Sequence, residues 1–254
     1  MEDLKKTVDD LTKNIHSRDE QISLLQRINE TLLRGYCLSV GGYMCIRPLE
    51  VEVYYVNEKS VPPFVDTNMH CMVDPKSDIF RLQSARYGQL YYHLKGKGGI
   101  DVCLSDSASY ALCCTIKSAR IDGVDVWRAS NVCRVVMERI CEHECRGDEE
   151  AAVGRVNDLH SVPVLALCDD PVTDGCVYHI RRNLRRRDRN YSLPLHSFMD
   201  VWNRKMLLTS VERVNLYMKA HPAENVVDVM RREGFRFIPG EIRLKYGIKR
   251  SERL

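Results

Sequence analysis

The stretch that decides the fold is LEVEVYYV at residues 49–56, in which apolar and polar side chains alternate with a period of two. Successive side chains of an extended chain point to opposite faces, so this period predicts a β-strand. One face of that strand would be apolar and pack on a core, as is typical of antiparallel sheets. The apolar face would carry Leu49, Val51, Val53 and Tyr55, and the other face would carry Glu50, Glu52 and Tyr54.

Further strands follow this segment along the chain. Residues 90–94 and 100–104 flank the glycine-rich stretch 95–99, an order that predicts a β-hairpin. Residues 110–121 favour a fourth strand, which would end at Asp122-Gly123. The fold class that follows is α+β, with a curved, mostly antiparallel sheet and flanking helices. Other segments favour helices at 129–146, 203–219 and 222–233, a charged loop at 147–160 and a short strand at 162–167.

Residues 1–34 carry a helical pattern. Alternate steps of four and three residues from Leu4 to Leu32 give an apolar seam that only Arg18 and Asn29 interrupt. Such a heptad seam is typical of a coiled coil, in which a seam asparagine can fix the register of a dimer. The pattern therefore predicts one helix that pairs with a second copy through residues 4–32. The alternative is a helix that packs back on its own domain.

We expect three parts in the chain: a heptad helix at 1–34, an α+β domain at 36–200 and a basic helical extension at 201–254. With 44% hydrophobic and 29% charged residues, the 254-residue chain can bury a core, which argues against a largely disordered protein. No apolar run approaches the length of a membrane span, and the charged N-terminus does not resemble a secretory signal. These features predict a cytoplasmic or nucleoid-associated protein without a membrane partner.

The 11 cysteines form no paired zinc knuckles, so we expect reduced thiols rather than a metal centre. Cys141 and Cys145 share a helix face but supply only two ligands. The expectation is that neither a metal nor another cofactor is needed.

The polar face of the strand at 49–56 is the strongest candidate for chemistry. A carboxylate on a rigid strand is a suitable general base for water if it lies in a cleft, and a tyrosine beside it can line a pocket for a flat ring. The alternative is the solvated polar face of an edge strand. A second set comprises His70, His93, Asp101 and Lys117, of which His93 and Asp101 flank the hairpin turn.

Two basic segments point to nucleic acid. Six arginines fall within residues 181–189, a density that suits contacts with phosphates, although a solvated basic loop is the alternative. The hairpin turn adds backbone N–H groups and two lysines. The net charge of +3 is too small to imply nucleic-acid binding by itself. The candidate contacts are Lys95, Lys97, Arg181, Arg182, Arg185, Arg186 and Arg187.

In the order of its segments the chain resembles the methylpurine-DNA glycosylase family, also called alkyladenine DNA glycosylases. That family has a strand of the form V-E-x-E-A-Y, which residues 49–54 match, and a G-x-L-Y strand, which residues 88–91 match. The resemblance covers about residues 36–200. It implies that Glu52 activates water, that Tyr54 lines the base pocket and that His70 is the pocket histidine. His93 would replace a stacking aromatic, Asp101 or Cys103 would lie near the pocket asparagine and Lys117 would replace an arginine.

The function that the resemblance implies is excision of alkylated or deaminated purines from DNA. The damaged nucleotide would be flipped out of the duplex into the pocket before hydrolysis. The family's Y-G-M-Y motif, whose tyrosine wedges into DNA, is replaced here by residues 96–99, which read GKGG. This departure keeps open a non-catalytic module on the same fold that binds DNA, RNA or nucleotides. A dimeric interaction protein without nucleic acid is a third hypothesis.

Overall fold

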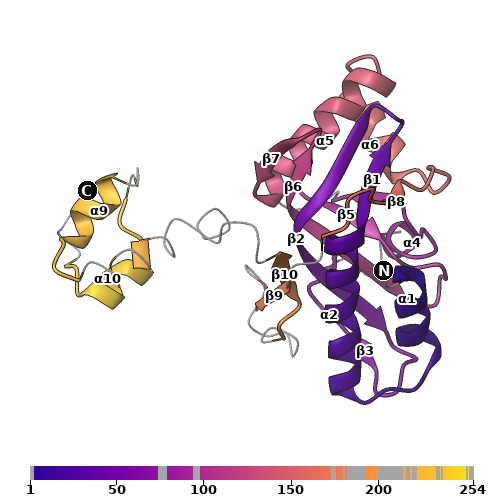
Figure 1. Ribbon diagram of the computed structural model, residues 1–254, viewed down its shortest axis with the longest axis horizontal. Coiled ribbons are helices and arrows are strands. Elements are labelled where there is room, and N and C mark those ends of the chain that lie inside the picture. Colours follow the sequence, from indigo (N-terminus) through magenta and orange to yellow (C-terminus); the bar gives the residue numbers. More distant parts are fainter. Residues whose placement is uncertain are drawn as a thin grey trace. The chain divides into compact units, whose positions relative to one another are not determined.

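The fold is described from a computed structural model of the chain (Figure 1). Two compact units make up the chain, residues 1–201 and 202–254. The first holds the whole sheet, and the second is a small helical unit. The residues that the structure describes are 3–73, 79–93, 98–172, 176–179, 181, 193–199, 214–215, 218, 222–232, 235, 237–249 and 251.

The first unit is an α+β structure built on a curled, ten-stranded antiparallel sheet, as the sequence predicts. The strands are β1 (Tyr36–Val40), β2 (Met44–Asn57), β3 (Phe64–Val65), β4 (Leu90–Tyr92), β5 (Ile100–Cys103), β6 (Ala111–Ile121), β7 (Val124–Trp127), β8 (Leu165–Leu167), β9 (Cys176–His179) and β10 (His196–Met199). Its described helices are α1 (Leu4–Lys13), α2 (Arg18–Gly35), α3 (His70–Val73), α4 (Ile79–Gln83), α5 (Ala129–Glu144) and α6 (Glu149–Asn157).

Two long strands form the spine of the sheet. Strand β2 pairs with β6 from Ile46 to Val56, and its other edge pairs in turn with β1, β10 and β3. The order β4-β5-β6-β2-β1-β8 places β2 in the interior of the sheet. The predicted hairpin is present as β4 and β5, and the predicted fourth strand is β6. Because β2 is a central strand, its polar face is not the solvated face of an edge strand.

Both faces of β2 are covered, which explains why the carboxylates on it are buried. Helix α2 lies against the apolar face, where Asn29 contacts Cys114 and Ser197. These two residues are the cross-strand partners of Val53 and Val51. On the opposite face, Tyr54 joins an apolar cluster with residues of α3 and α4. The glutamates next to Tyr54 therefore lie inside the curl of the sheet.

The expectation of one helix at residues 1–34 is wrong, because the segment forms two helices that pack side by side (Figure 1). Ser17 caps the second helix, and its side chain and that of Glu20 form a reciprocal capping box. This local signal outweighs the continuous heptad pattern. The seam residues Leu4 and Leu32 are fully buried within the chain. The seam is therefore used to pack α1 on α2 and α2 on the sheet of the same chain, and it leaves little apolar surface for a dimer through residues 4–32.

Asn29 connects α2 with β10 instead of setting the register of a dimer. It is fully buried, and its amide donates hydrogen bonds to Leu195 O (3.1 Å) and Ser197 Oγ (2.9 Å). We expect Asn29→Ala to lower the free energy of unfolding by about 1–3 kcal/mol, because it removes the two buried hydrogen bonds to Leu195 O and Ser197 Oγ. Urea titration at several protein concentrations measures this. A loss that varies with concentration would instead indicate a dimer.

Several helices were not predicted from the sequence, among them α3, α4, α6 and α10. Residues 147–160 were expected to be a loop, but they contain α6, whose first turn is capped by the side chain of Asp148. In the second unit, the helix expected at 222–233 is the shorter α9 (Val226–Arg232), and the basic tail contains α10 (Gly240–Tyr246). Most of the helix expected at 203–219 lies outside the described residues.

Candidate functional site

The sheet aligns four polar residues in one row. Asp101 on β5 pairs with Thr115 on β6, Thr115 pairs with Glu52 on β2, and Glu52 pairs with His196 on β10. Directly paired residues of antiparallel strands project from the same face of the sheet. Glu52 and Asp101 are therefore two strand spacings apart, about 10 Å, on the inner face. The row brings together residues that are far apart in the sequence.

A bulge places a cation beside the row. Glu50 pairs with Ser118 and Val51 pairs with Ile116, so Lys117 is an extra residue on β6. Bulges of this kind redirect side chains. As a result, both Lys117 and Ser118 reach carboxylates on the same face of β2.

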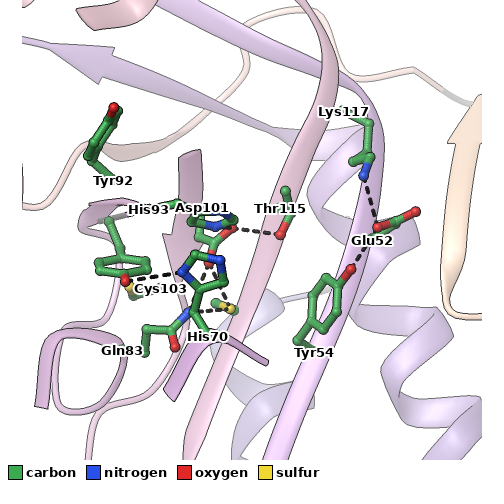
Figure 2. A network of polar contacts seen from close by, with 12 residues as sticks. Glu52, Tyr54, His70, Gln83, Tyr92, His93, Asp101, Cys103, Thr115 and Lys117 are labelled. Carbon is green, nitrogen blue, oxygen red and sulfur yellow. Dashed lines mark hydrogen bonds and ion pairs between the residues drawn. The ribbon is translucent and has the colours of Figure 1, made fainter. Parts of the chain in front are cut away.

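Glu52 is the centre of the first cluster. Its Oε2 accepts hydrogen bonds from the Tyr54 hydroxyl (2.8 Å) and from Lys117 Nζ (3.0 Å), as Figure 2 shows. The side chain of Glu52 is 0% exposed, whereas that of Lys117 is 23% exposed. The cation favours the ionised carboxylate, which is the form that a general base requires. Burial and then the charge of Glu52 raise the pKa of Tyr54 well above 10, so its hydroxyl keeps its proton and donates it to this bond.

A second buried carboxylate lies next to Glu52. Glu50 Oε1 accepts a hydrogen bond from His196 Nε2 (2.6 Å), and its Oε2 accepts one from Ser118 Oγ (2.6 Å). Sequence reasoning missed this network, although the period of two places Glu50 on the same face as Glu52. His196 lies on a strand whose position beside β2 the sequence does not reveal.

The other predicted pocket residues form a second cluster, around Asp101 (Figure 2). The rings of His70 and His93 lie with their centroids 3.9 Å apart and their planes tilted by 33°. His93 Nε2 lies 2.8 Å from Asp101 Oδ1, and Thr115 Oγ1 donates to the same oxygen at 2.6 Å. All the predicted catalytic and pocket residues therefore lie on one face of the sheet, in two clusters on either side of β6.

Two groups of this cluster should make stability depend on pH in separate windows. Burial, and then repulsion by His93, lowers the pKa of His70 from 6.5 to about 4. The folded state thus disfavours protonation of His70. The contribution of His70 to the free energy of unfolding is therefore complete above pH 6.5 and declines as the pH falls toward 4. Folding lowers the pKa of Asp101 from 3.8 to about 2. The contribution of Asp101 to the free energy of unfolding therefore declines as the pH falls from 3.8 to about 2.

Urea titrations across this pH range measure both effects. The Asp101 contribution corresponds to about 2 kcal/mol. We expect His70→Asn to remove only the upper dependence and Asp101→Asn only the lower one. Unchanged pH profiles in both variants would contradict the assignments.

Arg181 was predicted to contact nucleic acid, but the structure places it in the interior. Its side chain is 0% exposed and forms an ion pair with Asp66, whose side chain is equally buried. Its guanidinium also lies 4.6 Å from the centroid of the Tyr54 ring and donates to Val53 O. Arg181 therefore supports the strand that carries Glu52 and has no surface for a phosphate contact. Sequence reasoning gave no role to Asp66.

The other predicted nucleic-acid contacts lie outside the described residues: Lys95, Lys97, Arg182, Arg185, Arg186 and Arg187. Among the residues with described positions, no group of three histidine, cysteine or acidic side chains is arranged to hold a metal ion. No helix in that part of the chain combines the length and the apolar character needed to cross a membrane. No protein-family model matches the chain, and no curated protein matches its sequence.

Proposed function

We propose that the chain hydrolyses the N-glycosidic bond of an alkylated or deaminated purine in DNA. The observation that carries the proposal is the state of Glu52, a fully buried carboxylate on a central strand beside a cation and a tyrosine. A base in this position is held rigidly, which favours activation of a water molecule. The rings of His70 and His93 on the same face supply surfaces on which a flat base can stack.

In this mechanism the damaged nucleotide leaves the duplex and enters the inner face of the sheet. Glu52 takes a proton from water while the oxygen of that water bonds to C1′ of the sugar. The bond between C1′ and the purine nitrogen breaks, and its electron pair leaves with the purine. Lys117, which binds Glu52 and is 23% exposed, is the neighbour of the base that solvent reaches. The reaction needs no cofactor.

DNA is the proposed partner, with RNA as the alternative. Exposed lysines of the second unit, Lys245 and Lys249, provide cations for phosphate contacts. Binding should therefore weaken as salt increases, which a fluorescence titration with labelled duplex, single strand and RNA measures.

A non-catalytic nucleic-acid or nucleotide-binding module is the second candidate. The observation in its favour is that Lys117 and Tyr54 already share one oxygen of Glu52, as in a structural ion pair. The sequence also lacks the wedge tyrosine of the glycosylase family. Purine release from a duplex that contains hypoxanthine separates the two candidates, since a binding module retains the duplex without releasing the base.

A further inference from the structure

Helices α5 and α6 form the walls of a groove beside β4, with a volume of about 320 Å³. The floor of the groove is made of buried and half-buried side chains: Tyr92, Met137, Cys141, Ala152 and Val153. Tyr92 follows Tyr91 on β4, so the two side chains point to opposite faces of the strand. Figure 2 shows Tyr92 directed away from the cluster around Asp101. The groove is therefore separate from the candidate functional site.

Both walls of the groove follow helical spacing. On α5 the lining residues fall at 134, 137, 138, 141 and 142, and on α6 they fall at 149, 152 and 153. Steps of three and four residues keep side chains on one face of a helix, so each wall is one continuous stripe. From residue 134 to residue 142 the α5 stripe extends about 12 Å, or roughly two turns. A groove of this form, between two helices, has the shape that a third helix fills.

The rim of the groove is negatively charged. It carries three exposed glutamates, Glu138, Glu142 and Glu149, and one cation, Arg134. Arg134 Nη1 already binds both carboxylate oxygens of Glu138, each at 2.8 Å. The side chains of Glu142 and Glu149 form no ion pair or hydrogen bond within the described part of the chain. Burial raises the pKa of the Cys141 thiol in the floor, and the charges of Glu149 and Glu142 raise it further, so both carboxylates act on the same space.

We propose that this groove is a docking site for a basic amphipathic helix of a partner protein. The apolar side chains of that helix, spaced by three and four residues, lie on Met137, Cys141 and Val153. Its lysines or arginines lie beside Glu142 and Glu149, and the same two carboxylates repel an acidic helix. The flexible thioether of Met137 adapts to the apolar side chain that it meets. This proposal does not depend on the proposed glycosylase activity.

The test uses the full chain and two labelled helical peptides. Both peptides have leucines spaced by three and four residues, and the other positions are lysine in one peptide and glutamate in the other. We expect wild type to bind the lysine peptide and not the glutamate peptide, as measured by fluorescence anisotropy. Glu142→Lys/Glu149→Lys should weaken binding of the lysine peptide by about 5–30-fold, the loss of two exposed ion pairs, and should create binding of the glutamate peptide.

Glu150→Lys is the matched control for Glu149→Lys. Glu150 is an exposed glutamate next to Glu149 that does not line the groove. We expect Glu149→Lys to weaken binding of the lysine peptide by about 2–5-fold and Glu150→Lys to leave it nearly unchanged. Val153→Asp separates docking from simple charge attraction, because it adds a negative charge but removes an apolar contact. Docking predicts weaker binding of the lysine peptide by Val153→Asp, whereas charge attraction alone predicts stronger binding.

Cys141 reports whether the peptide lies in the groove. It is 8% exposed in the floor, whereas Cys45 is an exposed thiol on β2 that does not line the groove. We expect the lysine peptide to slow alkylation of Cys141 and to leave alkylation of Cys45 unchanged, as measured by mass spectrometry after digestion.

Four results would each overturn the docking site: no binding of the lysine peptide by wild type, equal weakening by Glu149→Lys and Glu150→Lys, stronger binding by Val153→Asp, or unprotected Cys141. A wild-type dimer that Glu142→Lys/Glu149→Lys dissociates would assign the groove to a second copy of the chain and would also overturn the proposal. None of these results changes the test of purine release.

Discussion

Glu52→Gln is expected to lower the rate of purine release by about 10²–10⁴-fold, the usual contribution of a general base. The amide has nearly the shape of the carboxylate and can still accept a hydrogen bond from Tyr54 or Lys117, so the fold should persist. It cannot take a proton from water at neutral pH, so the chemical step should stop. Single-turnover release of hypoxanthine from a labelled duplex measures the rate, and fluorescence anisotropy measures DNA binding, which should stay within a few-fold of wild type.

Glu50→Gln is the matched control. Glu50 is two residues away on the same strand face, is also buried and also accepts two hydrogen bonds. We expect this variant to lose stability but to keep most of its activity, because Glu50 is not the proposed base. Equal activity of Glu52→Gln and wild type would remove Glu52 from the mechanism, and equal losses in both variants would indicate a structural effect of the buried carboxylates.

The sequence predicted the local parts of the site well, because a strand's period is a local property. The alternation at 49–56 gives β2 and places Glu50, Glu52 and Tyr54 on one face, as the structure confirms. The hairpin prediction likewise brings His93 and Asp101 together across β4 and β5.

The sequence did not predict contacts that depend on which strands become neighbours. The partnership of Glu52 with Lys117 depends on the pairing of β2 with β6 and on a bulge at Lys117. No local pattern marks that bulge. The dimer prediction from the heptad pattern was wrong for a related reason. An apolar seam indicates that a helix is covered, but it does not identify the element that covers it. Here the sheet of the same chain covers it.

Arg181→Met is expected to reduce the free energy of unfolding by about 3–5 kcal/mol, because it leaves the buried carboxylate of Asp66 without its ion-pair partner. The methionine retains much of the apolar stem of the arginine, so the loss reports mainly on charge. Urea titration at neutral pH measures it. A basic residue on the surface would behave differently, since its removal usually changes stability by less than about 0.5 kcal/mol.

The double variant Asp66→Asn/Arg181→Met separates these explanations. If the two charges compensate each other in the interior, the double variant should be more stable than Arg181→Met alone, because no unpaired charge remains. The salt dependence of DNA binding should stay as in wild type for all these variants, since Arg181 is enclosed. A small stability loss combined with a salt slope reduced by about 1 would place Arg181 on a phosphate and contradict its buried position. The same comparison bears on Glu52, because Arg181 contacts the backbone of Val53 and the ring of Tyr54, the two residues that follow the proposed base on β2.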